Sequence, residues 1–135
     1  MEGRKIAVFD IDGTVFRSSL VLELVETLIA RDIFPMSAKT MYEGTKEEWE
    51  NRTGEYEPFI RGVVQAFATH AKGASFEEVA NIAGEVIEAN KDHVYRYTRD
   101  LIQSYKSDGY FLLAISHSPK FIVDGFCYEQ GFDKS

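Results

Sequence analysis

The sequence predicts an α/β protein in which a parallel sheet is interrupted by a long helical insertion. Two short apolar runs, residues 6–9 and 110–115, lack polar alternation, a pattern that is typical of strands covered on both faces of a parallel sheet. Apolar residues recur at helical spacing over most of the chain between these runs, and each run ends in a polar cluster. Buried strands separated by helices argue for a parallel sheet.

The insertion is expected to be entirely helical. Its helices are predicted over residues 20–31, from Ser37 through Trp49, from Pro58 to Lys72, and from Phe76 to about Asp108, with a break at Gly84 or Asn90 in the last. Ser18 or Ser19 can cap the first helix and Ser37 the second, because a serine hydroxyl accepts an otherwise unpaired amide hydrogen. Ser75 and Glu78 fit a capping box.

A last helix is predicted after the second strand. Pro119 suits its first turn, and Gly131 marks its end. Phe121 and Phe126 belong to its apolar stripe. Ser118 is interpreted as the cap of this helix, since Pro119 follows it directly.

The composition narrows the class of partner. With 15 Lys and Arg against 22 Asp and Glu, the net charge is −7, which argues against nucleic acid or an anionic membrane, because both need clustered positive charge. No apolar run approaches the roughly 20 residues of a membrane span. The single cysteine, Cys127, cannot form an internal disulfide, and the chain opens on Met1 to Lys5 without an apolar signal core. We therefore expect a cytoplasmic protein with a small or polar partner.

Two carboxylates follow the first predicted strand. Asp10 and Asp12 start from the same side of an extended chain end, so they repel each other unless a cation intervenes. A hard divalent ion such as Mg²⁺ fits, since it takes one or two carboxylates together with water and phosphate oxygens. Gly13 lets the backbone turn sharply and brings its amide near an anion, while Thr14 adds a hydroxyl donor.

The second polar cluster follows the other predicted strand. Ligands of open α/β sheets bind outside the carboxyl ends of the strands, and Ser116 stands there ahead of a helix whose free amides favour phosphate. The two clusters together predict an anion pocket beside a metal. Simpler interpretations stay open: Asp10 and Asp12 as a polar strand end before an Asp-Gly turn, Ser116 as an ordinary helix cap, and His117 as a solvated loop histidine.

Residues 9–14, Phe-Asp-Ile-Asp-Gly-Thr, resemble the first motif of the haloacid dehalogenase-like hydrolases, which is Asp-x-Asp-Gly-Thr or Asp-x-Asp-Gly-Val after a buried strand. Ser116, in Ile-Ser-His-Ser-Pro, looks like the second motif as found in the phosphoserine-phosphatase-like branch, and the insertion resembles that branch's helical cap. The resemblance implies an α/β fold with a Rossmann-like parallel sheet core over 1–16 and 106–135, incomplete at the C-terminus, and an inserted all-helical cap over 17–105.

The same resemblance implies a Mg²⁺-dependent phosphatase, that is, a phosphomonoester hydrolase acting on a small phosphorylated metabolite. Asp10 would be the nucleophile that forms an aspartyl-phosphate, and Asp12 would protonate the leaving oxygen and then activate water. The metal would be held by the carboxylate of Asp10 and the backbone carbonyl of Asp12. The residues expected to bind phosphate are Gly13, Thr14, Ser116 and His117.

The sequence departs from the family pattern after the second motif. The third motif, a lysine, and the fourth, an acidic pair, have no counterpart before Ser135. We therefore expect a truncated chain that is weakly active or inert and that could self-associate through an unpaired sheet edge or apolar face. Lys120 could stand in for the missing lysine, although a solvated lysine at a helix start is the simpler interpretation. Arg17 could equally touch substrate or lie at the surface.

Two other classes of function are kept beside the phosphatase. A non-catalytic module that binds phosphate or Mg²⁺ would fit a chain that natively ends at Ser135. A phosphoacceptor receiver domain also gathers acidic residues at strand ends. Its short, regular alternation of strand and helix fits the long insertion badly.

Overall fold

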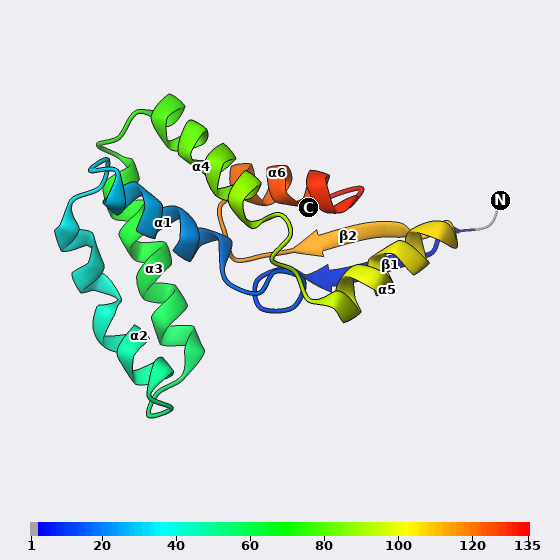
Figure 1. Ribbon diagram of the computed structural model, residues 1–135, viewed down its shortest axis with the longest axis horizontal. Helices are drawn as coiled ribbons and strands as arrows, with labels where there is room; N and C mark the ends of the chain where they lie inside the picture. The colour runs from blue at the N-terminus through cyan, green and yellow to red at the C-terminus, as the bar shows by residue number, and fades with distance from the viewer. Residues whose placement is uncertain (1–2) are drawn as a thin grey trace. The chain divides into compact units, whose positions relative to one another are not determined.

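The computed structural model describes residues 3–135, which form two parallel strands and several helices. The elements, drawn in Figure 1, are β1 (Ile6–Asp10), α1 (Leu20–Ala30), the 3₁₀-helix η1 (Met36–Met41), α2 (Glu43–Glu50), α3 (Tyr56–Ala71), α4 (Phe76–Asn90), α5 (Arg96–Ser107), β2 (Phe111–Ile115) and α6 (Lys120–Gln130). They divide into two compact units. The first unit contains the chain up to Leu20 together with Gly84–Ser135, and the second contains Val21–Ala83.

The sheet belongs to the first unit and is parallel, as the sequence predicts. Its two strands lie side by side in Figure 1, in a register that places Ile6 opposite Phe111 and Asp10 opposite Ile115. Beyond the strand, Ile11 N donates to the Ile115 carbonyl at 3.0 Å. Both strands therefore end at the same edge of the sheet, which is what brings the two polar clusters together.

Only one face of this sheet is covered by the described residues. On the covered face, the ring of Phe9 packs edge-on against Tyr105 of α5 and against Phe132. On the other face the exposed fractions are 57% for Ile6, 54% for Val8 and 57% for Ile115. The prediction that both strands are covered on both faces is therefore wrong for this part of the chain. A continuous apolar run shows that a strand can be covered, but it does not show what covers it.

A helix end in the first unit matches its sequence signal. Gly131 closes α6 in the left-handed conformation, with φ at +89°, as expected for a glycine just past a helix C-terminus. Inside the unit, the Phe16 and Phe126 rings pack with centroids 5.2 Å apart, and both side chains are fully buried. This contact ties the loop after β1 to α6, so the loop stands on a packed core.

The second unit differs from the prediction at its second helix. The sequence favours one helix from Ser37 through Trp49, but the structure has η1 followed by α2, with Tyr42 between them at φ −139°. Pro35, not Ser37, precedes η1, and no side chain caps it. Tyr42 is only 2% exposed, so burial of its ring overrides the local helical preference.

The remaining helix boundaries agree in part. Helix α3 begins at Tyr56, two positions before the predicted start at Pro58. The Glu78 amide donates to the Ser75 hydroxyl at 3.4 Å, which supplies one half of the predicted capping box. The predicted break in the long helix occurs at Asn90, where α4 ends, and not at Gly84.

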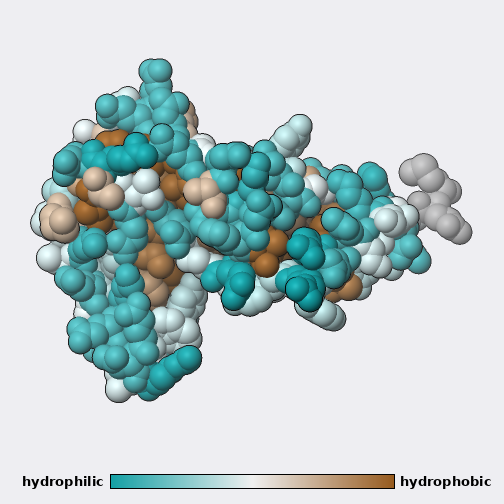
Figure 2. All heavy atoms as spheres, viewed as in Figure 1, coloured by the Kyte–Doolittle hydropathy of each residue, from teal (hydrophilic) through white to brown (hydrophobic). Residues whose placement is uncertain are grey.

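Hydrophilic residues cover most of the face drawn in Figure 2, and hydrophobic residues show between them. Among the described residues, no helix combines the length and apolar character that crossing a bilayer requires. The two compact units divide the chain differently from the expected core and cap, and the boundaries at residues 17 and 105 stay a prediction.

Candidate functional site

The candidate site lies where the two parallel strands end. Asp10 is the last residue of β1 and pairs with Ile115, the last residue of β2. Asp12 and Ser116 follow in the two loops, and the Ser116 hydroxyl donates a hydrogen bond to Oδ2 of Asp12. The structure therefore brings together two predicted site residues that are 104 positions apart in the sequence.

Three donors from the protein reach the Asp12 carboxylate. Its Oδ1 accepts the backbone N–H of Leu20 at 2.8 Å and the hydroxyl of Ser118 at 3.2 Å, while Oδ2 accepts from Ser116. Leu20 is the first residue of α1, so the Asp12 carboxylate also caps that helix. Three donors on one carboxylate hold it in a single orientation.

Asp10 stands in a different environment from Asp12. It is exposed, and its Oδ2 accepts the Thr14 hydroxyl at 3.0 Å. No other side chain or amide among the described residues donates to its carboxylate. This carboxylate is therefore available to a cation or to an electrophile approaching from solvent.

Gly13 makes the turn that the sequence predicts. Its φ is +79°, a left-handed conformation that glycine adopts without a Cβ penalty. Its amide, however, donates to the carbonyl oxygens of Phe16 at 2.9 Å and Ser18 at 3.1 Å. In this conformation the Gly13 amide is thus engaged inside the loop, and contact with a phosphate would require it to leave these partners.

The start of α5 also holds the loop after β1 in place. The Thr98 hydroxyl, on α5, donates to the Thr14 carbonyl at 2.9 Å, and Tyr95 N donates to the Val15 carbonyl at 3.0 Å. Thr98 is buried. The loop that carries the two aspartates is therefore fixed by α5 as well as by the strand ends.

Within the described residues, no hydrogen bond or ion pair joins Asp10 or Asp12 to the other candidates, His117, Arg17 and Lys120. His117 is exposed in the bend after Ser116. The guanidinium of Arg17 lies 5.5 Å from the centre of the Tyr95 ring, a cation–π contact. Lys120 pairs with Asp124 at 3.1 Å one turn along α6, and its side chain is 75% exposed. That pairing agrees with the solvated interpretation of Lys120.

The residues present fit a Mg²⁺ ion as far as the chemistry of their donors goes. Mg²⁺ is held by one or two carboxylates, with water and substrate oxygens completing its shell. The Asp10 carboxylate is exposed, and among the described residues no N–H donates to the backbone carbonyl of Asp12, which leaves both oxygens able to act as ligands. The side-chain oxygens of Asp12 are already occupied. Within residues 3–135 no group of three or more His, Cys, Asp and Glu side chains is placed to hold a metal.

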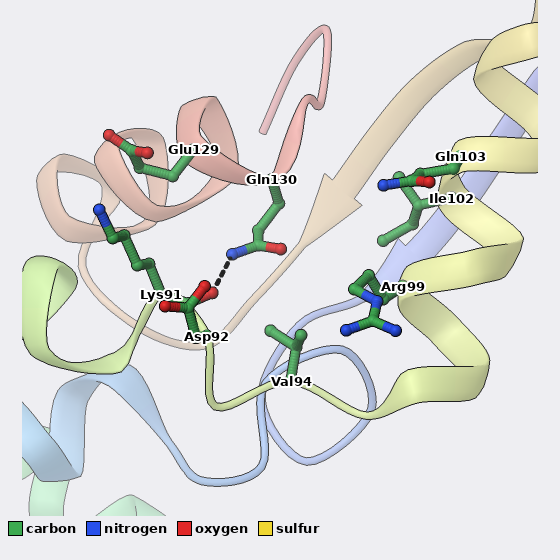
Figure 3. A pocket seen from close by; sticks show the side chains of 8 residues that line it. All are labelled: Lys91, Asp92, Val94, Arg99, Ile102, Gln103, Glu129 and Gln130. Carbon is green, nitrogen blue, oxygen red and sulfur yellow. Dashed lines mark hydrogen bonds between the residues drawn. The ribbon is translucent and has the colours of Figure 1, made fainter.

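A cavity lies elsewhere in the first unit. It has a volume of about 520 Å³ and is lined by residues of α5, α6 and the segment after α4. Figure 3 shows Arg99 and Gln103 on one wall and Lys91 and Glu129 on the opposite one, with Gln130 donating to the Lys91 carbonyl at 2.7 Å. None of the predicted site residues lines it. The cavity is therefore separate from the cluster at the strand ends.

Cys127 belongs to α6, and its side chain is buried in the core. Burial raises the pKa of its thiol to about 12, and the negative charges of Asp124 and Asp12 add to the effect. The thiol is therefore neutral at physiological pH, and it is unsuited to act as a nucleophile.

Sequence reasoning missed two side chains that shape the site. Ser118 is predicted to cap the last helix, but Pro119 is the capping residue there, no side chain caps that helix, and the Ser118 hydroxyl donates to Asp12 instead. The Ser-x-Ser spacing after the strand is the one local signal for it. Thr98 gives no such signal, because its partner, Thr14, is 84 positions away.

Comparison with known proteins gives a fold but no family. No protein-family model matches the sequence. No curated protein matches it either.

Among solved structures, the chain is similar to the crystal structure of a protein with unknown function from Bordetella pertussis Tohama I. The TM-score is 0.69 at 15% sequence identity, and the match covers 98% of this chain and 59% of that one. The two proteins share a fold, and this chain spans 59% of the length of its neighbour. A structure described as a dehalogenase matches with a TM-score of 0.40 and 12% identity, over 99% of this chain and 62% of that chain. That score is too low to support a conclusion.

Proposed function

We propose that the chain is the part of a Mg²⁺-dependent phosphomonoester hydrolase that carries the nucleophile, Asp10. The resemblance of residues 9–14 to the first motif of the haloacid dehalogenase-like hydrolases supports the proposal, and so does the parallel α/β fold. The observation that carries it is the hydrogen bond from Ser116 to Asp12, since it joins the first and second motifs at one edge of the sheet. A shared edge is what a phosphate held between the two motifs requires.

Each site residue of the chain has its own role in the proposed reaction. Asp10, exposed at the strand end, attacks phosphorus and becomes the aspartyl-phosphate. Asp12 gives a proton to the leaving oxygen and later takes one from the attacking water. Ser116 donates its hydroxyl to a phosphoryl oxygen, with Thr14 and His117 as further donors. The amide of Gly13 joins them once it has left the carbonyls of Phe16 and Ser18.

Mg²⁺ would be held by the Asp10 carboxylate and the Asp12 carbonyl, where it would neutralise the charge of the nucleophile and the phosphoryl oxygens. The proposed substrate is a small phosphorylated metabolite. The helices between the two motifs are proposed to form a cap over residues 17–105 that selects this substrate, and the Ile-Ser-His-Ser-Pro segment supports the phosphoserine-phosphatase-like branch.

Turnover of p-nitrophenyl phosphate tests the proposal, in the longest native reading frame that contains these residues. We expect hydrolysis with Mg²⁺, loss of hydrolysis in EDTA, and a fall of at least about 10³-fold in Asp10→Asn. Asp100→Asn is the matched control, because Asp100 is an exposed aspartate of α5 that pairs with Arg99. Equal rates for wild type and Asp10→Asn would overturn the catalytic assignment.

One observation favours the alternative of a non-catalytic phosphate-binding or Mg²⁺-binding module. Both oxygens of Asp12 accept hydrogen bonds from neighbouring residues, which is the environment of a structural carboxylate. A module of this kind would bind inorganic phosphate in the presence of Mg²⁺ and would show no turnover in any reading frame. Calorimetric titration beside the turnover assay separates the two functions.

A further inference from the structure

The donors on the Asp12 carboxylate are divided unequally between its two oxygens. Oδ1 accepts two of them, the Leu20 amide at 2.8 Å and the Ser118 hydroxyl at 3.2 Å. Oδ2 accepts one, the hydroxyl of Ser116. The two sets also differ in how easily they can be withdrawn.

The donors on Oδ1 are difficult to withdraw. Leu20 is fully buried and begins α1, so its amide has no partner inside the helix. Ser118 is only 9% exposed, so little water can reach its hydroxyl to replace Asp12 as the acceptor. Both donors therefore favour keeping Oδ1 where it is.

The donor on Oδ2, the Ser116 hydroxyl, can turn to donate to a substrate oxygen instead. Ser116 is half-buried and has a single hydroxyl proton, which can be given to one acceptor at a time. Its oxygen accepts the Ser118 amide at 3.0 Å, and this bond holds the side chain while the proton changes acceptor. When the Ser116 hydroxyl donates its hydrogen bond to a phosphoryl oxygen instead, Oδ2 of Asp12 loses its donor. Oδ1 keeps both of its donors.

We propose that Ser118 is a positioning residue, which anchors Oδ1 of Asp12 so that Oδ2 is the oxygen that exchanges protons with the substrate. The inference rests on the proposed function and assigns to Ser118 a role other than a helix cap. In the first step Oδ2, which takes up a proton from solvent once the Ser116 hydroxyl has left it, passes that proton to the leaving oxygen as the bond from this oxygen to phosphorus breaks and the Asp10–phosphorus bond forms. In the second step Oδ2 accepts a proton from water as the water oxygen bonds to phosphorus and the Asp10–phosphorus bond breaks, which releases phosphate.

The kinetic test compares Ser118→Ala, Ser118→Thr and the control Ser107→Ala, which changes an exposed serine at the end of α5. We expect Ser118→Ala to lower kcat by roughly 10- to 100-fold, part of the 10²- to 10⁴-fold that a placed acid or base contributes, with little change in KM. Ser118→Thr keeps a hydroxyl at the same carbon and should recover most of the loss. An unchanged kcat in Ser118→Ala, or a loss that the threonine does not recover, would overturn the proposal.

A second measurement separates this inference from the proposed function, because it needs no turnover. Amide hydrogen exchange followed by NMR reports directly on the Leu20 N–H, which depends on the position of Oδ1. We expect Ser118→Ala to speed exchange at Leu20 more than at Ile11, whose amide donates to the Ile115 carbonyl in the same unit. Equal changes at both amides would mean that Ser118 acts only on global stability, and would overturn the positioning role even in an active enzyme.

Discussion

The carboxylate of Asp12 accepts the backbone N–H of Leu20 at 2.8 Å, so a residue of the loop after β1 caps helix α1 from eight positions upstream. A helix cap ordinarily lies next to the helix that it caps. Here the capping carboxylate also receives the hydroxyls of Ser116 and Ser118. One side chain therefore links the end of the first strand, the start of a helix and the end of the second strand.

This linkage predicts unequal stability effects for the two aspartates. Asp12→Ala leaves three donors without their acceptor and should lower the free energy of unfolding by about 2–4 kcal/mol. Asp10→Ala removes an exposed carboxylate with one hydroxyl partner and should change it by no more than about 0.5 kcal/mol. Urea unfolding followed by circular dichroism measures both. Equal losses would contradict the account of Asp12.

We also expect the Thr98 hydroxyl to stabilise the loop after β1. Thr98→Val keeps the shape of the side chain and removes the hydroxyl that donates to the Thr14 carbonyl, so we expect a loss of about 1–2 kcal/mol. Thr40→Val removes an exposed hydroxyl in η1 and serves as the control, with an expected change within about 0.5 kcal/mol. Thermal unfolding of the two variants tests the difference. If Thr98→Val is as stable as its control, the bond to Thr14 does not hold the loop.

Two helical glycines predict opposite outcomes for the same substitution. At Gly62 in α3, an added Cβ would lie 2.6 Å from the Met41 carbonyl oxygen, so Gly62→Ala should destabilise by about 1–3 kcal/mol. At Gly84 in α4, no atom lies within 4 Å of an added Cβ, so Gly84→Ala should stabilise by about 0.5–1 kcal/mol. Urea unfolding gives the sign of each change. A stabilising Gly62→Ala would show that α3 and η1 pack less closely than described.

Cys127 predicts a dependence of stability on alkaline pH. The pKa of its thiol is raised from 9.0 in the unfolded chain to about 12 in the folded protein, since burial disfavours the thiolate. Its stabilising contribution is therefore complete below pH 9 and is lost as the pH rises from about 9 to about 12, by up to about 1.4 kcal/mol per pH unit. Cys127→Ala should show a correspondingly shallower decline. Identical pH slopes for the two proteins would contradict the raised pKa.

Much of the first unit could be predicted from local sequence. The two apolar runs place both strands within a residue of their observed bounds, and the parallel pairing follows from the helices between them. Gly13 and Gly131 both adopt the left-handed conformation that their positions predict. Residues close by in the sequence determine these features, so the local sequence pattern is sufficient to predict them.

What the sequence did not predict depends on distant partners. Ser118 looks like a helix cap locally, but its hydroxyl donates a hydrogen bond to Asp12, 106 positions away. The exposed face of Ile6, Val8 and Ile115 cannot be inferred from an apolar run, because the run does not specify what packs on it. The break at Tyr42 likewise depends on burial of its ring. In each case tertiary context outweighs the local preference.

The most direct test of the central claim is to look for a phosphoryl group on Asp10. The protein is incubated with a small phosphate ester and Mg²⁺, quenched in acid, digested and examined by mass spectrometry, with Asp10→Asn and an EDTA sample alongside. We expect one phosphoryl group on the peptide that contains residues 9–14, located at Asp10 and missing from both comparison samples. Turnover without that adduct, or an adduct on another residue, would contradict the assignment of Asp10 as the nucleophile.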